Sequence, residues 1–211
     1  MKKEEIDQYQ YQKILEYVVP VFMNRGLKST TMDALASALK ISKRTLYEIF
    51  GSKEDLFSEA LKYFHNRMAE ELKKIFANSE NVMEGIIKSF LYNRDMMSNV
   101  SAAFIRDTEQ FVKDKVKADS PSPHNHQNLY NILQKGVKEG YFREDMNLMV
   151  QCRMLALQME SLKRTEELFP DDITLLDVYD NIIIGFLRGL SSQKGLEELE
   201  KFMPSLTQSY H

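Results

Sequence analysis

The sequence predicts an all-α protein, and three observations lead to this fold class. Apolar residues recur at three-to-four spacing along most of the 211 residues, whereas no segment alternates apolar and polar residues as a half-buried strand does. Only five prolines and eight glycines interrupt the chain. Hydroxyl residues that can cap helices stand just before several apolar segments. We therefore expect a fold of about nine or ten helices.

The first part of the chain, as far as Phe76, predicts four helices. The first carries apolar residues from Ile14 to Phe22 and ends at Gly26, because a glycine after the last periodic residue is a typical helix stop. Each of the next three helices begins after a hydroxyl residue that can accept a bond from an unpaired backbone N–H. The predicted caps are Thr30 or Thr31 for the second helix, Ser42 for the third helix at about Lys43–Phe50, and Ser52 for the fourth.

The remainder predicts a larger helical body. Residues 118–128, which hold two of the prolines, read as a loop. We expect one domain over residues 1–52 and a second over residues 53–211. The helices expected beyond Phe76 lie at about 82–95, 128–139, 146–167, 173–190 and 195–202.

Composition and charge narrow the class of protein. A single cysteine excludes an internal disulfide, no secretion signal is evident, and the longest apolar runs are far shorter than the roughly 20 residues of a bilayer-spanning helix. We therefore expect a cytoplasmic protein that does not enter a membrane. The net charge is −3, yet residues 25–53 hold six basic residues against two acidic ones. A basic segment on an acidic body suits a polyanionic partner, although charge alone fits a solvated helix face equally well.

The basic segment also has the apolar spacing of a helix-turn-helix, a short helix, a tight turn and a second short helix that bury their contact. The second helix would present Lys43, Arg44 and Thr45 at its N-terminal end, which is the end that reaches base edges in the major groove. Hydroxyl and ammonium groups nearby suit phosphate contacts. The candidate DNA-binding residues are Thr31, Ser42, Lys43, Arg44, Thr45, Tyr47 and Lys53.

The stretch "GLKSTTMDALASALKISKRTLYEIFGSKEDLF", from Gly26 to Phe57, resembles the DNA-binding segment of the tetracycline-repressor (TetR) family. The chain departs from the family pattern at the turn, where Lys40 stands in place of a common glycine. The resemblance implies a repressor that binds a double-stranded, palindromic DNA operator as a homodimer. It also implies release by a small-molecule effector bound in the C-terminal domain, without a cofactor.

A dimer and an effector pocket need residues in the second domain. The two long helices near 146–167 and 173–190 are apolar enough to bury more than one face, and an interior position in a monomer is the alternative. The candidate dimer residues are Met149, Cys152, Leu155, Leu162, Tyr179, Ile183, Phe186, Leu187 and Leu190. Aromatic residues and methionines could line a largely apolar effector pocket, although such residues are more often plain core. The candidate ligand-binding residues are Phe64, Met68, Phe90, Arg94, Met97, Phe104, Arg106, Phe111, Tyr130, Gln158 and Met159.

Other patterns give weaker indications. His124 and His126 lack a third partner at metal-ligand spacing, so we expect no metal site. Cys152 lies on an apolar helix face, where a buried thiol is a simpler interpretation than a redox sensor. No phosphate loop or nucleophile motif supports enzyme activity. The alternative to a DNA-binding regulator is a helical ligand-binding or adaptor protein that uses the N-terminal unit for docking.

Overall fold

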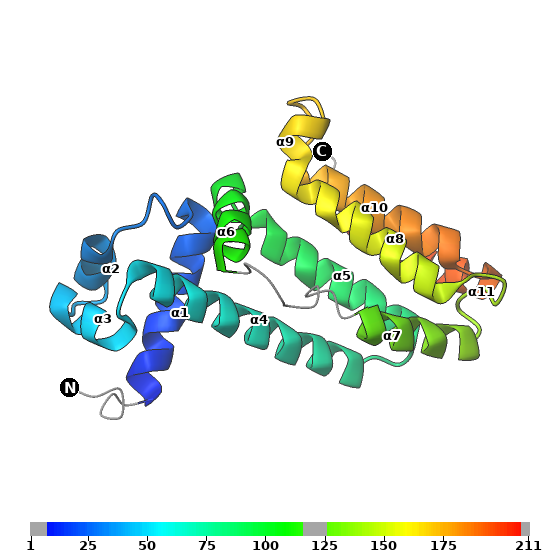
Figure 1. The fold of residues 1–211 in the computed structure, drawn as a ribbon. Coiled ribbons are helices and arrows are strands. Elements are labelled where there is room, and N and C mark those ends of the chain that lie inside the picture. The colour runs from blue at the N-terminus through cyan, green and yellow to red at the C-terminus, as the bar shows by residue number, and fades with distance from the viewer. Residues whose placement is uncertain (1–7, 116–125, 208–211) are drawn as a thin grey trace. The chain divides into compact units, whose positions relative to one another are not determined.

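The computed structural model of the chain describes residues 8–115 and 126–207, and these residues form helices with no β-strand among them (Figure 1). This confirms the predicted all-α class. The chain divides into two compact units, of which the first spans Met1–Glu71 with Asn99–Ala118 and the second Leu72–Ser98 with Asp119–His211, as far as these are described. The division falls inside one long helix, whereas the boundary at residue 52 was expected from the sequence and stays a prediction.

The first unit contains the four predicted helices and one that the sequence analysis missed. Its helices are α1 (Gln8–Arg25), α2 (Met32–Ala38), α3 (Lys43–Phe50), the first part of α4 (Lys53–Ala77), and α6 (Ala102–Lys115). Helix α6 was not predicted, although it carried a signal. The Ser101 hydroxyl accepts a bond from the backbone N–H of Phe104, at 3.1 Å, as an N-cap does.

Aromatic packing around Phe57 holds the first unit together. Phe57 on α4 is fully buried, and its ring lies edge-on to Phe22 of α1, with 5.0 Å between ring centroids. It makes similar contacts with Phe104 and Phe111 of α6, at 5.9 and 5.2 Å. Edge-to-face pairs add about 0.5–1.5 kcal/mol each beyond the burial of area. These aromatic contacts therefore join α1, α4 and α6 in one core.

The second unit begins within α4 and continues through the C-terminal helices. These are α5 (Val82–Ser98), α7 (His126–Lys138), α8 (Leu148–Ser161), the 3₁₀ turn η1 (Leu162–Arg164), α9 (Thr165–Leu168), α10 (Leu175–Leu190) and α11 (Gln193–Thr207). The helix expected over 146–167 is thus interrupted, since α8 ends at Ser161 and a 3₁₀ turn follows. Most of the expected loop at 118–128 lies outside the described residues.

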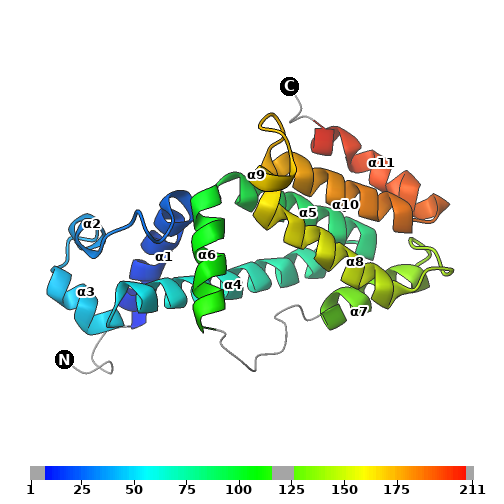
Figure 2. The ribbon, with the colours of Figure 1, turned by 45° about the horizontal axis from the view of Figure 1, so that its top comes forward.

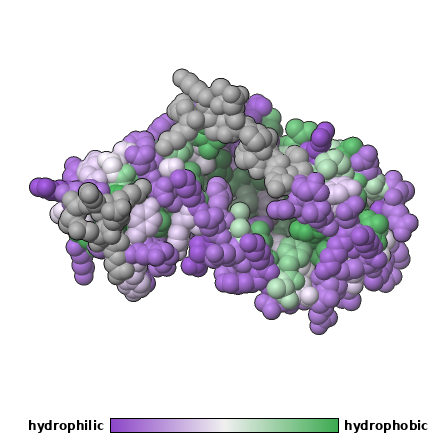
Figure 3. Space-filling model, turned by 60° about the horizontal axis from the view of Figure 1, so that its bottom comes forward, coloured by the Kyte–Doolittle hydropathy of each residue, from purple (hydrophilic) through white to green (hydrophobic). Residues whose placement is uncertain are grey.

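Helices α8 and α10 pack side by side in this unit, as two views show (Figures 1 and 2). Their inner faces join α5, α7 and α11 around buried apolar residues, among them Met83, Ile87 and Leu199. On the face shown in Figure 3, hydrophilic residues cover most of the surface and apolar residues gather in separate patches. Within the described residues, no helix is both long and apolar enough to cross a bilayer.

Candidate nucleic-acid interface and apolar pocket

The helix-turn-helix is fixed by local hydrogen bonds at both ends of its turn. Thr31 has an extended backbone and its hydroxyl accepts the N–H of Ala34 at 3.2 Å, which caps α2. The turn passes through Lys40, a non-glycine residue with a φ of 56°, and the N–H of Ile41 then bonds to the carbonyl of Ala36 at 3.0 Å. A left-handed residue of this kind costs roughly 1–2 kcal/mol, which the departure from glycine imposes here.

Helix α3 separates its buried and exposed residues clearly. The Ser42 hydroxyl caps the helix by accepting the N–H of Thr45 at 3.0 Å, and the Ser42 and Thr45 hydroxyls lie 2.8 Å apart. Leu46, Ile49 and Phe50 are buried on one side. The opposite side exposes a set of polar side chains near the N-terminal end: Lys43, Arg44, Tyr47 and Glu48.

Both basic side chains of this exposed face lie against carboxylates. Lys43 donates to Asp33 across the turn at 2.9 Å, and the Arg44 Nε donates to Glu48 one helical turn later at 2.8 Å. The hydrogen bond that Lys43 donates to Asp33 raises the pKa of Lys43, and the one that Arg44 donates to Glu48 lowers the pKa of Glu48. Exposed pairs of this kind are weak and screened by salt, so a polyanion can replace the carboxylates.

Lys53 has a role that the sequence did not predict. Its ammonium donates to the backbone carbonyls of Leu27 and Thr30, at 3.0 and 3.1 Å. It therefore ties the start of α4 to the loop that precedes α2. A phosphate contact by Lys53, expected from the sequence, stays a prediction and would use the remaining N–H.

Asp107 of α6 also binds the loop that precedes α2. The sequence did not predict this contact. Its nearly buried carboxylate accepts the backbone N–H of Lys28 at 3.0 Å. Gly26 lies against it with a φ of +77°, and a Cβ added there would lie only 2.7 Å from the Asp107 Oδ2. The loop from Gly26 to Thr31, which presents the Thr31 hydroxyl, is thus held by α4 and α6 together.

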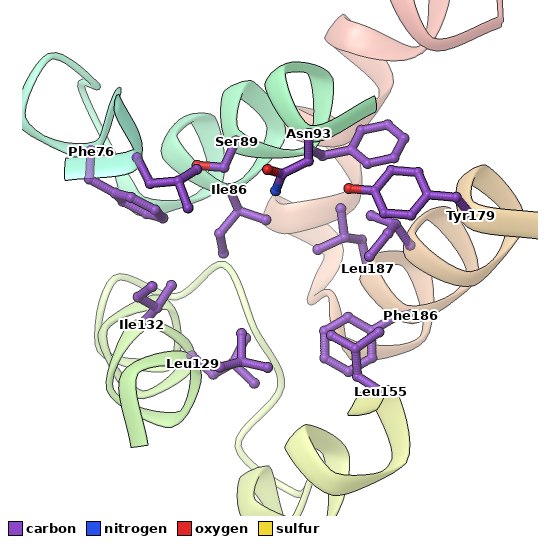
Figure 4. Close-up of a pocket in the computed structure, with 14 residues that line it drawn as sticks. Phe76, Ile86, Ser89, Asn93, Leu129, Ile132, Leu155, Tyr179, Phe186 and Leu187 are labelled. Carbon is purple, nitrogen blue, oxygen red and sulfur yellow. The ribbon is translucent and has the colours of Figure 1, made fainter. Parts of the chain in front are cut away.

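An apolar pocket lies within the second unit (Figure 4). It is lined by the end of α4 and by α5, α7, α8 and α10, and its volume is about 210 Å³. Leucine, isoleucine and phenylalanine supply most of its wall, and its polar residues are Ser89, Asn93 and Tyr179. Burial raises the pKa of the Tyr179 phenol, and the nearby Asn93 amide has a smaller, opposite effect on that pKa.

The structure distributes the predicted ligand-binding residues over both units. Phe90 lines the pocket, and Gln158 lines a second hollow beside Phe169 and Ile173. Met97, Tyr130 and Met159 pack against the core of the second unit. The other predicted residues do not line the pocket. Arg94 forms an ion pair with Asp180. The rest lie in the first unit: Phe64, Met68, Phe104, Arg106 and Phe111.

Most of the predicted dimer residues lie on the inner faces of α8 and α10, and their part in a dimer stays a prediction. Four are buried in the core of the single chain: Cys152, Tyr179, Leu187 and Leu190. Leu155, Ile183 and Phe186 line the apolar pocket. Leu162 packs against the core, and Met149 is half-buried. The spacing of apolar residues predicted the two helices, but the sequence could not show which of the two apolar faces of each helix turns inward.

The outer face of α8 is also apolar, and the predicted dimer residues did not include it. Val150, Met154 and Leu157 are 47, 49 and 73% exposed at successive helical turns. On the adjacent α10, a Cβ added at Gly185 or Gly189 would meet nothing within 4 Å. We use the name α8–α10 face for these five residues, which are exposed on two helices that pack together.

Metal and thiol chemistry find no support among the residues that the structure describes. No group of three or more His, Cys, Asp or Glu residues within residues 8–115 and 126–207 could hold a metal ion. His124 lies outside the described residues. Cys152 is buried, and burial raises the pKa of its thiol, so the reactive thiolate is disfavoured.

Comparisons with known proteins agree with this geometry. The family model "Bacterial regulatory proteins, tetR family" matches residues 14–60. The chain is 25% identical to the HTH-type transcriptional repressor KstR2 of Mycobacterium tuberculosis over 68% of this chain and 74% of that protein. It is 24% identical to the negative transcriptional regulator IcaR of the Staphylococcus aureus biofilm operon icaADBC, over 77% of each chain. The crystal structure of a TetR-family regulator from Cytophaga hutchinsonii shares the fold, with a TM-score of 0.66, 20% identity, and coverage of 90% of this chain and all of that one.

Proposed function

Because this chain is a DNA-binding transcriptional regulator of the TetR family, we propose that it represses transcription by binding a palindromic operator as a homodimer, and that a small molecule releases it. The observation that carries the proposal is the exposed N-terminal end of α3, where Lys43 and Arg44 stand on a helix fixed by the Ser42 cap. A helix presented in this way reads base edges in the major groove. The names of KstR2 and IcaR, a repressor and a negative regulator, support repression.

Operator binding is tested by gel-shift titration of the protein against genomic fragments at several salt concentrations. Arg44→Ala should weaken the selective complex 5- to 150-fold, because a bidentate arginine–guanine contact is worth about 1–3 kcal/mol of discrimination. Arg143→Ala is the matched control, since Arg143 is also exposed and paired with a carboxylate, Asp145, but lies in the second unit. If both variants bound DNA like the parent, α3 would not be the reading helix.

The homodimer rests on the α8–α10 face. Three large apolar side chains exposed in a row are unusual on a protein that remains a monomer, and the two glycines leave room for a second helix to approach. A two-fold axis would place this face against its own copy, and two reading helices would then meet two half-sites of the operator.

Sedimentation velocity tests this arrangement. Leu157→Glu places a charge at the most exposed residue of the face and should shift the protein to a monomer, with loss of operator binding. Val112→Glu is the control, because Val112 is an exposed apolar residue of α6 in the first unit. A Leu157→Glu variant that remained a dimer would place the interface elsewhere.

Release by an effector is assigned to the apolar pocket of the second unit. A ligand changes the population of two states only by its differential affinity for them, so the effector would bind the form that cannot hold the operator more tightly. Cytoplasmic location and the absence of a membrane partner belong to the same proposal, since the operator is reached there.

A further inference from the structure

The walls of the apolar pocket define the chemistry of what can enter it. We infer that the effector is a neutral, single-ring molecule with one oxygen that hydrogen-bonds at Asn93 and Tyr179, an inference that rests on the proposed ligand-controlled function. None of the fourteen lining residues has a side chain charged at neutral pH. The polar residues of the lining are Ser89, Asn93 and Tyr179, and they differ in the hydrogen bonds that they can make with a ligand.

Ser89 has no hydrogen-bond donor left for a ligand oxygen. Its hydroxyl donates to the carbonyl of Gly85, one turn earlier on α5, at 2.7 Å, and is buried there. A hydroxyl that bonds back into its own helix satisfies its single donor. The hydrogen-bonding capacity of the wall therefore concentrates at the other two residues.

Asn93 of α5 and Tyr179 of α10 face one another at one side of the cavity (Figure 4). The phenol stays protonated, because burial raises its pKa. The amide has two donors and an oxygen with two lone pairs, so it can bond a ligand even while it interacts with Tyr179. One ligand oxygen can be held at this pair, while the apolar wall gives the rest of the ligand no polar partner.

A charged ligand would find no counter-ion among the described residues that line the pocket. Arg94 is the cation next in sequence to Asn93, and its Nε donates to both oxygens of Asp180, at 2.9 Å each. Asp180 is almost fully buried, so this guanidinium already has its carboxylate. A carboxylate or phosphate in the pocket would be desolvated without compensation, which is strongly unfavourable. An anionic group placed at Asn93 and Tyr179 is therefore disfavoured.

The volume sets the size. An apolar cavity of about 150 Å³ is known to take up benzene. The present pocket, at about 210 Å³, is larger by less than one half and is partly open to solvent, so the part of a ligand that it encloses is one ring with a short substituent. Ring faces also suit the aromatic walls of Phe76, Phe90 and Phe186.

Three probes of matched shape test this inference in isothermal titrations with the full chain and no DNA. Ethylbenzene has the ring without oxygen, acetophenone adds one neutral oxygen, and benzoate carries a charge at the same place. We expect acetophenone to bind several-fold more tightly than ethylbenzene and at least tenfold more tightly than benzoate. Benzoate binding as tightly as acetophenone, or no binding by either neutral probe, would overturn the inference.

Variants of the wall assign the contact. Asn93→Leu and, with less risk to folding, Tyr179→Phe should remove the preference for acetophenone over ethylbenzene. Ser89→Ala should keep this preference, because its hydroxyl is committed to Gly85. Leu129→Trp should fill the cavity and abolish binding of both neutral probes. If acetophenone kept its advantage in both Asn93→Leu and Tyr179→Phe, the oxygen would not lie where we place it.

The same protein samples, titrated with operator DNA, separate this inference from the proposed function. A protein that binds its operator but none of the probes would contradict the ligand class and leave DNA-binding regulation standing. A protein that binds acetophenone with the stated preferences but no DNA would support the ligand class and contradict the repressor.

Discussion

The two units use opposite means to build their functional surfaces. In the first unit, polar side chains fix the helix-turn-helix: Thr31 and Ser42 cap its helices through bonds to the next turn, and Lys53 of α4 holds the loop carbonyls of Leu27 and Thr30. In the second unit, side chains distant in sequence, from Leu72 to Leu187, meet in an apolar pocket. The difference agrees with the proposed function, because a surface that reads DNA needs fixed polar geometry, whereas a pocket for an apolar molecule needs volume and apolar walls.

The buried ion pair of the second unit gives the largest expected effect and tests how far apolar packing alone maintains that unit. Asp180→Asn removes the charge that compensates Arg94, and the free energy of unfolding should fall by about 3 kcal/mol in urea titrations, because breaking a buried pair leaves one charge uncompensated. Burial raises the pKa of Asp180 while Arg94 lowers it, which shows that the carboxylate is costly to bury.

The double variant Arg94→Met with Asp180→Leu is the control for this pair. Apolar residues of similar volume replace both charges, so its stability should return close to that of the parent. Equal losses in the single and double variants would mean that the pair contributes a net stabilisation and that packing does not suffice.

Replacing Lys53 should give the next largest loss of stability. It tests whether polar contacts fix the loop that precedes α2 in the first unit. Lys53→Met removes the two bonds to loop carbonyls, and the free energy of unfolding should fall by about 2 kcal/mol, as expected for hydrogen bonds from a charged donor. Lys62→Met, on the same helix but paired on the surface with Glu59, should change stability by less than about 0.5 kcal/mol. Unchanged stability in Lys53→Met, together with a flatter salt dependence of DNA binding, would favour a phosphate contact over the loop contact.

The same difference explains what the sequence could predict. Caps and stops are local signals, so Gly26, Thr31 and Ser42 marked helix ends that the structure confirms. The pocket was largely missed, since its members share no spacing and become neighbours only through the packing of α5, α7, α8 and α10. For α8, apolar residues on both faces concealed whether Cys152 or Leu157 turns outward. The Asp107 and Asp180 contacts are long-range, and a carboxylate alone in a sequence does not name its partner.

The smallest expected effect compares two helix caps of the same residue type, one in each unit. Thr31 caps α2, and Thr174 caps α10 with a reciprocal bond from its own N–H to Asp177 at 2.8 Å. Replacing either threonine with alanine should lower the free energy of unfolding by about 1 kcal/mol, which thermal denaturation can measure. Only Thr31→Ala should also weaken operator binding in gel shifts, since its hydroxyl is exposed where a phosphate can meet it. Equal weakening of operator binding by both variants would mean that helix stability, and not the polar geometry of the first unit, limits DNA binding.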